Sequence, residues 1–227
     1  MKIGVGISTH NRRELFNRCH SEWINALPKG SVVVVVDDAS QVPCPVANTR
    51  FETQQGVAKS KNECIRLLLD AGCTHLFLSD DDIWPRGGHA VDAYINSGLG
   101  HASLSFQHNS KGDMYSLDVF VKHKRPGYWA YNWPNGCMMY MTSEAAKFIG
   151  YYDESFGLWG LEHVDYSIRM HQGGFTPFLF TDIPNGIDYF HSMDYYGLVE
   201  SSVPESVRRE LAARNHDILK RKYKGLL

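Results

Sequence analysis

The sequence predicts an α/β fold with a central, mostly parallel sheet. Three apolar segments have the composition of buried strands, at residues 2–8, 31–38 and 74–79, and each ends in polar or acidic residues. Segments with helical spacing of apolar residues follow the first and the second, which is the alternation typical of α/β sheets. The chain of 227 residues is long enough to bury one ordinary core.

The first 82 residues contain the strand and helix signals in order. After the apolar run 2–8, apolar residues recur at helical spacing through residues 15–27. The run 32–36 consists of valine alone, the pattern of a strand that is covered on both faces. A second helix is predicted at 56–72, where Gly72 is a stop signal.

Polar residues follow each of the three predicted strands. Because ligands bind beyond the carboxyl ends of strands in such sheets, these residues should converge on one site. They are His10, Asn11, Asp37, Asp38, Asp80, Asp81 and Asp82.

The second half of the chain has a different pattern. Alternation of polar and apolar residues predicts antiparallel strands at 100–107 and 113–124, and a last strand is expected at 175–180. Helices are predicted at 143–150, 159–174 and 205–223. We expect one domain over residues 1–200 and a helical tail over 201–227.

Composition bears on the compartment and on the partners. The formal net charge is −2, so the overall field favours neither nucleic acid nor an anionic membrane. The five cysteines form no Cys-x-x-Cys pair, which favours free thiols in a reducing compartment. Apolar runs fall short of the roughly 18 residues that a membrane helix needs. We therefore expect a cytoplasmic protein without a transmembrane segment.

Two short motifs bear on the ligand. The segment GVGIST at 4–9 begins like a dinucleotide fingerprint, but its third glycine position is Thr9, which argues against a nicotinamide cofactor. Three aspartates, Asp80 to Asp82, come directly after a strand. Hard cations such as Mg²⁺ and Mn²⁺ prefer carboxylate oxygens and share their coordination with phosphates. The run predicts a cation site, with a solvated acidic turn as the alternative.

Five segments in order resemble the glycosyltransferases with the GT-A fold, most closely the family 2 type and relatives with a galactosyltransferase-like C-terminal motif. They are GVGISTHNR, VVVVVDDAS, GVAKSKNECI, FLSDDD and the segment 135–175. The resemblance covers about residues 1–192. It implies a nucleotide-sugar-binding half over 1–100 and an acceptor-side half over 101–200. The implied activity is metal-dependent transfer of a sugar from a nucleotide diphosphate donor, uridine-based, to a hydroxyl.

The resemblance also implies roles for the matching residues. Residues implied to contact the nucleotide-sugar are Ser8, His10, Asp37, Asp38, Lys59, Asn62, Asp80, Asp81, Trp159 and Gly160. The implied metal ligands, around Mn²⁺ or Mg²⁺, are Asp80, Asp82 and His191.

The residue that would take the proton of the acceptor hydroxyl departs from the family pattern. Inverting relatives commonly show Trp-Gly-x-Glu-Asp with the Asp as base, whereas this chain has Glu162 and His163 in the last two positions. Glu162 is the first candidate for the base and His163 the second. Asp165 lies four residues before Arg169, so an ion pair on a helix is expected there. Inverting and retaining outcomes both stay open.

The acceptor and the oligomeric state are not indicated. The aromatic residues within 128–133 suit a stacking platform or core packing. The basic runs 121–125 and 220–225 suit a solvated surface or a polyanionic acceptor. The lack of membrane helices argues against a processive polysaccharide synthase, leaving a glycan, a protein or a hydroxylated DNA base as acceptor.

Two other functions stay open. A nucleotidyltransferase also uses a carboxylate pair at a strand end, but the glycine-rich basic loop expected of it is missing from ISTHNRRE. A nucleotide-sugar-binding module without catalysis would explain why Glu162 and His163 replace the usual pair.

Overall fold

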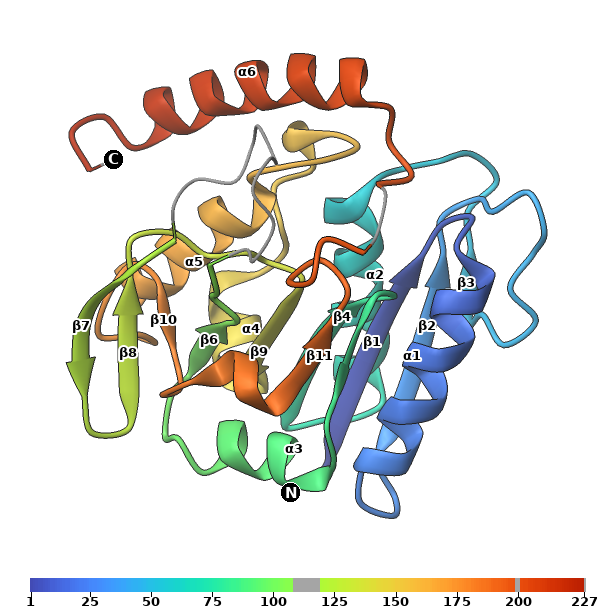
Figure 1. The fold of residues 1–227 in the computed structure, drawn as a ribbon, viewed down its shortest axis with the longest axis horizontal. Helices are drawn as coiled ribbons and strands as arrows, with labels where there is room; N and C mark the ends of the chain where they lie inside the picture. The colour runs from blue at the N-terminus through green and yellow to red at the C-terminus, as the bar shows by residue number, and fades with distance from the viewer. Residues whose placement is uncertain (108–118, 199–200, 227) are drawn as a thin grey trace.

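The computed structural model describes residues 1–107, 119–198 and 201–226, and these form three layers, helices on both faces of a sheet (Figure 1). In this part of the chain the central sheet has six strands in the order β3-β2-β1-β4-β9-β6. β3, β2, β1 and β4 run parallel, whereas β9 runs antiparallel to β4 and β6. The bounds are β1 Ile3–Thr9, β2 Val32–Asp37, β3 Thr49–Arg50, β4 His75–Asp80, β6 His101–Ser103 and β9 Met138–Thr142. The predicted α/β class is confirmed.

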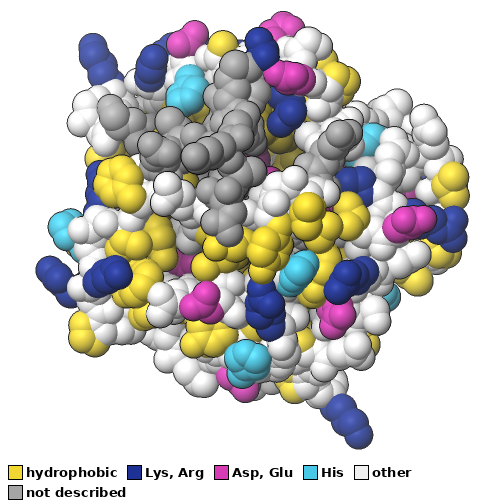
Figure 2. Space-filling view, viewed as in Figure 1, with side chains coloured by type: hydrophobic (Ala, Val, Ile, Leu, Met, Phe, Trp, Pro, Cys, Tyr) yellow, Lys and Arg dark blue, Asp and Glu magenta, His cyan; other side chains and the backbone are white. Residues whose placement is uncertain are grey.

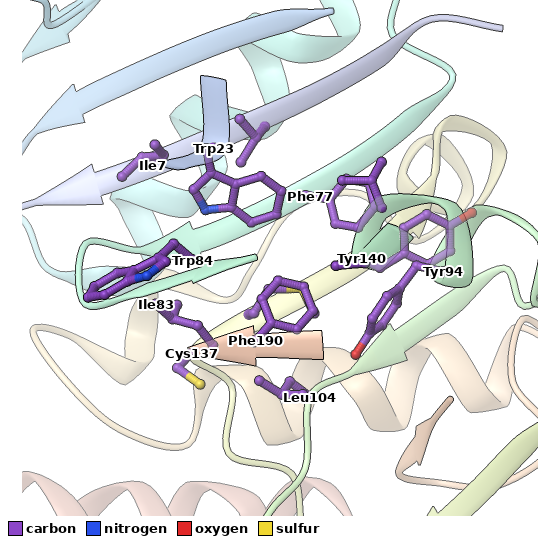
Figure 3. Close-up of a cluster of buried hydrophobic side chains, with 14 of the residues drawn as sticks. Ile7, Trp23, Phe77, Ile83, Trp84, Tyr94, Leu104, Cys137, Tyr140 and Phe190 are labelled. Carbon is purple, nitrogen blue, oxygen red and sulfur yellow. The ribbon is translucent and has the colours of Figure 1, made fainter. Parts of the chain in front are cut away.

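Each face of the sheet has its own apolar layer. α1 (Arg13–Ala26), α3 (Gly88–Ile95) and the strand pair β5 (Ile83–Pro85) and β11 (Phe190–Ser192) cover one face. Figure 3 shows Trp23 of α1, Phe77 and Phe190 close together in this layer. α2 (Val57–Asp70), α4 (Ser143–Ile149) and α5 (Glu162–Gln172) cover the other face.

The valine run of β2 serves both layers, as its composition predicts. Val35 belongs to the layer under α1, whereas Val34 and Val36 belong to the layer under α2. Gly6 of β1 lets α2 approach the sheet, because a Cβ atom there would lie 2.5 Å from Cβ of Cys64. Packing of α2 therefore explains Gly6, one of the two glycines in the segment that begins like a dinucleotide fingerprint.

Two predicted strands differ from the structure. Residues 175–180 form no strand, and only Thr181–Asp182 forms β10. Pro177 lacks an N–H donor, and the carbonyl of Phe178 accepts hydrogen bonds from the hydroxyls of Thr176 (2.7 Å) and Thr181 (3.1 Å). Within 100–107 the strand β6 is confined to three residues. Of the predicted strand 113–124, residues 113–118 lie outside the described residues.

A small antiparallel sheet lies beside the central one, as expected. β7 (Val121–Arg125) and β8 (Tyr128–Tyr131) form a hairpin, and β8 also pairs with β10. Short 3-10 turns lie at Glu154–Phe156 and Gly186–Tyr189.

α6 (Glu205–Lys222) lies across one end of the molecule (Figure 1). Its Leu219 and the following Tyr223 are buried in a third apolar cluster with Val164 and Ile168 of α5. The segment predicted as a tail is therefore packed onto the second half of the chain, residues 101–200.

The outer surface carries charges of both signs. Figure 2 shows Lys or Arg and Asp or Glu side chains scattered around one face, with hydrophobic side chains gathered across its middle. None of the described helices is both long and apolar enough to cross a membrane.

Candidate functional site

A cavity of about 840 Å³ lies at the carboxyl ends of the parallel strands. Ser8 of β1, Asp38 after β2, and Asp80 and Asp82 at the end of β4 line one side of it. Residues 158–163, which lead into α5, line the other side. The predicted convergence at the strand ends is thus present, and it is the position where α/β sheets bind ligands.

The cavity brings together most of the side chains that the sequence indicates. Those that line it are Ser8, His10, Asp38, Asp80, Asp82, Trp159, Gly160, Glu162 and His163. Asp37, Lys59, Asn62, Asp81 and His191 are not among the lining residues.

The loop after β1 is fixed against the end of β2. Asn11 has a positive φ of 56°, its N–H donates to Ser40 Oγ (2.9 Å), and its Oδ1 accepts from the N–H of Gln41 (2.7 Å). His10 Nδ1 lies 2.5 Å from the carbonyl oxygen of Asp38. The loop therefore holds His10 at the wall of the cavity.

Asp38 organises the entrance to α2. Its carboxylate accepts hydrogen bonds from the backbone N–H groups of Gln55 (2.6 Å) and Gly56 (2.8 Å). Burial raises the pKa of Asp38, and these two hydrogen bonds oppose that effect. Asp38 therefore shapes the cavity through the backbone that it fixes.

Asp81 and Asp82 share one cation. Arg12 Nη2 lies 2.5 Å from Asp81 Oδ1, and Arg12 Nη1 donates to Asp82 Oδ2 at 2.7 Å. Asp81 is fully buried and also accepts a hydrogen bond from the hydroxyl of Thr9 (2.6 Å). Burial raises the pKa of Asp81, and the charge of Arg12 opposes that effect. Of the two carboxylates, Asp82 is the one that faces the cavity.

Asp80 lies beside a second, buried cation. Lys61 is 2 % exposed, and its Nζ lies 3.3 Å from Asp80 Oδ1 and 2.7 Å from the carbonyl oxygen of Gly136. Burial raises the pKa of Asp80, and the charge of Lys61 opposes that effect. Lys61, which lines the cavity beside Asp80, therefore favours the ionised form of Asp80.

The carboxylates fit a divalent cation that shares its coordination with a ligand. Asp80 Oδ1 is buried with the ion pair to Lys61 but no hydrogen bond, and Asp82 faces the same cavity. The described residues contain no cluster of three or more His, Cys, Asp or Glu able to hold a metal ion alone. One or two carboxylates completed by phosphate oxygens and water are the usual ligands of Mg²⁺.

Glu162 and His163 form a pair on the opposite wall. His163 Nδ1 lies 3.3 Å from Glu162 Oε1, and Glu162 Oε2 is buried without a hydrogen-bond partner. The imidazole lies on Gly136, where an added Cβ would come 2.3 Å from the ring Cγ. Burial alone would raise the pKa of Glu162, but the hydrogen bond from His163 and the charge of Lys61 hold it below its usual range. Glu162 is thus an anion with little basicity.

α6 fixes the loop that leads into this pair at the start of α5. The side chain of Asn215 is fully buried, and its Nδ2 donates to the carbonyl oxygens of Phe156 (2.9 Å), Trp159 (2.9 Å) and Gly160 (2.8 Å). Leu161, which follows, has a positive φ of 70° at the start of α5. The position of Glu162 therefore depends on a helix more than 40 residues later in the chain.

The predicted residues outside the cavity have other partners. Asp37 accepts from the N–H groups of Ser40 and Cys44, both at 2.9 Å. Asn62 exchanges two hydrogen bonds with the backbone of Tyr152, and Lys59 donates to Gln55. These three side chains hold local structure around the site.

His191 does not line the cavity that Asp80 and Asp82 line. It is on β11, its ring stacks on Trp84 with centroids 4.8 Å apart, and it lines a second, smaller pocket. Asp165 makes the expected helix ion pair with Arg169 at 2.9 Å.

The aromatic residues within 128–133 lie partly at the cavity and partly in the core, and the basic run 121–125 lies on the surface. Trp133 lines the cavity, whereas Tyr131 is buried in the third apolar cluster. Lys124 lies 4.2 Å from the ring centroid of Trp129. The run 121–125 is thus largely a solvated strand that covers an aromatic ring.

Arg12 and Lys61, the cations that contact the three aspartates, are not singled out by the sequence patterns. Both lie in segments with more than one basic residue: NRRE follows the first predicted strand, and AKSKN lies at the start of the predicted helix 56–72. A buried carboxylate requires a partner, so three adjacent aspartates are themselves a signal for cations nearby.

Comparisons with known proteins agree with this architecture. No protein-family model matches the chain. An uncharacterized glycosyltransferase of Acanthamoeba polyphaga mimivirus is 28% identical over 159 residues, which cover 67% of this chain and 59% of that protein. The chain therefore spans less than two thirds of that relative.

Two solved structures have similar folds. The structure of S. aureus TarS in complex with UDP has a TM-score of 0.58 and 14% identity, covering 97% of this chain and 72% of that one. GalNAc-T7 with UDP, GalNAc and Mn²⁺ has a TM-score of 0.62 and 14% identity, covering 81% of this chain and 42% of that one. At such low identity the likeness establishes a common fold.

Proposed function

We propose that this chain, which has the GT-A fold of the glycosyltransferases, transfers a sugar from a nucleotide diphosphate donor to a hydroxyl of an acceptor. The observation that carries the proposal is one cavity with Asp80 and Asp82 on one wall and the pair Glu162 and His163 on the other. The first pair suits a diphosphate with its cation, and the second suits a reacting hydroxyl.

The donor is a uridine diphosphate sugar in this proposal. The similar folds of TarS and GalNAc-T7 are both described with UDP, which supports that choice. Ser8 and His10 line the cavity at the end of β1 and are the groups that we assign to the nucleoside.

Asp80 and Asp82 are the residues that we assign to a Mn²⁺ or Mg²⁺ ion. The ion would neutralise charge that develops on the diphosphate leaving group, acting as a Lewis acid. Lys61, 3.3 Å from Asp80 Oδ1, opposes the effect of burial and favours the ionised form of Asp80. The Mn²⁺ described with GalNAc-T7 supports the assignment.

We assign the base to His163, with Glu162 as its positioning residue. Nδ1–H of His163 donates to the Glu162 carboxylate, which can only accept, so Nε2 of the neutral ring is free to take a proton. The held anion of Glu162 also stabilises the imidazolium that results.

The proposed reaction is a single displacement at the anomeric carbon. The acceptor oxygen forms a bond to that carbon while the bond from the carbon to the phosphate oxygen breaks. The hydroxyl proton passes to His163 Nε2, and the nucleoside diphosphate leaves. Such a displacement inverts the configuration of the sugar.

A panel of nucleotide-sugars tests the proposal. The wild type, supplied with Mn²⁺ and a mixture of hydroxyl acceptors, is expected to release nucleoside diphosphate from at least one uridine diphosphate sugar. His89→Asn, an exposed histidine on α3, is the control variant and should match the wild type. Folded protein that releases diphosphate from no donor in the panel would overturn the proposal.

A further inference from the structure

We propose that Arg12 is a resident cation of the site, which holds Asp82 until a nucleotide diphosphate binds and then transfers to the phosphate. This inference rests on the proposed function. It gives Arg12 a positioning role that decides when Asp82 is available to a divalent ion.

The contacts of Arg12 place it where a metal ion would compete. Its Nη1 occupies Asp82 Oδ2 at 2.7 Å, and both residues line the cavity. The Arg12 side chain is 22% exposed and that of Asp82 is 8% exposed. A divalent ion that binds Asp82 alone must therefore displace a charge-assisted hydrogen bond in a partly buried place.

The two aspartates hold Arg12 unequally. Asp81 is fully buried, keeps a hydrogen bond from Thr9, and does not line the cavity. Its contact with Nη2 would keep the guanidinium at the site while Nη1 changes partner. Arg12 Nε is buried without a hydrogen-bond partner, so the guanidinium has a donor left for a further anion.

A diphosphate would resolve this competition. It brings anionic oxygens that accept hydrogen bonds from Arg12, and the same group completes the coordination of a divalent ion on the freed Asp82. Because coupling between two ligands is reciprocal, the metal and the nucleotide should each favour binding of the other.

The test measures two affinities that should change in opposite directions. Binding of Mn²⁺ without nucleotide is measured by electron paramagnetic resonance of the free ion, and binding of UDP in EDTA by calorimetry. In Arg12→Gln we expect Mn²⁺ to bind about tenfold more tightly and metal-free UDP about tenfold more weakly, since a hydrogen bond to a charged group is worth roughly that factor.

Two further variants control the test. Arg13→Gln, an exposed neighbour, should leave both affinities at the wild-type values. Arg12→Lys keeps the charge and should lie between the wild type and Arg12→Gln, and a thermal unfolding curve checks that each variant is folded.

The outcomes separate this inference from the function on which it rests. If Mn²⁺ binds to Arg12→Gln no more tightly than to the wild type, or if the UDP affinity is unchanged, the inference is overturned. A structural defect would weaken the binding of both Mn²⁺ and UDP, and that result also overturns the inference. Wild-type protein that binds neither UDP nor Mn²⁺ would instead overturn the proposed function.

Discussion

Lys61 illustrates how much a single residue determines in this site. A lysine that is 2 % exposed must have partners, and its Nζ has the carbonyl of Gly136 at 2.7 Å and Asp80 at 3.3 Å. Burial lowers the pKa of Lys61, but the charges of Asp80 and Glu162 and the contact with Asp80 together outweigh it, so the pKa is raised and the side chain stays charged.

Removing that charge should cost stability. Lys61→Met leaves Asp80 without its cation, and we expect a loss of about 3 kcal/mol in the free energy of unfolding, measured with urea. The double variant Lys61→Met with Asp80→Asn should recover part of the loss, because no buried charge is then unpaired. Equal losses in the single and the double variant would contradict the pairing.

Replacing Glu162 and His163 one at a time should separate their roles. His163→Asn is expected to lower kcat by about 10²-fold to 10⁴-fold with a smaller change in the KM of the donor, as for loss of a general base. Glu162→Gln should lower kcat less, because His163 keeps its own nitrogen atoms. A larger loss for Glu162→Gln than for His163→Asn would identify Glu162 as the base.

Residue patterns predict which side chains meet, but not how they pair. The aspartates after β4 and the pair 162–163 line one cavity as strand ends and motif order indicate. Asp81, in the turn between β4 and β5, does not line the cavity and instead contacts Arg12 and Thr9. Arg12 and Lys61 contact these carboxylates through the tertiary fold, which local sequence does not encode.

At the scale of elements, α6 supports the site through one side chain. Asn215 spans from α6 to three carbonyl groups of the loop before α5, and Leu219 packs the same helix on the apolar cluster. Lys222, one turn further, contacts Asp153 (2.8 Å) and Asp165 (2.5 Å). Asn215 therefore positions the loop before α5, whereas Leu219 packs α6 on the apolar cluster.

Asn215→Ala should affect activity beyond its effect on stability. The variant loses the hydrogen bonds to the loop, and we expect about 1–3 kcal/mol of lost unfolding free energy together with a lower kcat. Leu219→Ala is the matched control, since it loosens α6 but breaks no hydrogen bond to residues 156–160. If both variants lose kcat in proportion to stability, Asn215 has no separate role in placing the loop.

Strong patterns predict the elements that carry them, and weak ones fail. The valine run of β2 and the helical spacing of α2 leave no alternative assignment. β9, with the sequence MMYMT, lies between β4 and β6, yet methionine has no preference for strands that would indicate it. The composition of the apolar segment 175–180 misleads, because Pro177 has no N–H to donate and hydroxyl groups of Thr176 and Thr181 occupy the carbonyl of Phe178.

At the scale of the whole molecule, a buried carboxyl makes stability depend on pH. Asp182 accepts hydrogen bonds from the hydroxyl of Tyr94 (2.7 Å) and the N–H of Ile183 (2.8 Å), and burial raises its pKa to about 7. Between about pH 4 and 7 the folded state keeps a proton that the unfolded state has lost. The contribution of Asp182 to the free energy of unfolding therefore falls as pH rises through that interval.

Asp182→Asn removes this titration. Urea unfolding at several pH values measures the free energy of unfolding. Between about pH 4 and 7, this free energy should fall by up to about 1.4 kcal/mol more per pH unit in the wild type than in the variant. Asp92→Asn, an exposed aspartate on α3, should follow the wild type. Parallel pH profiles for Asp182→Asn and the wild type would show that Asp182 is ionised in the folded protein.

The most direct test of the central claim is the metal dependence of donor turnover at Asp82. Release of nucleoside diphosphate from the accepted sugar donor is followed in EDTA and then in increasing Mn²⁺, for wild type, Asp82→Asn and the control Asp92→Asn. We expect no release in EDTA, recovery with Mn²⁺ in the wild type and the control, and at least a roughly 10²-fold lower rate in Asp82→Asn. Full activity in EDTA, or in Asp82→Asn, would contradict the account.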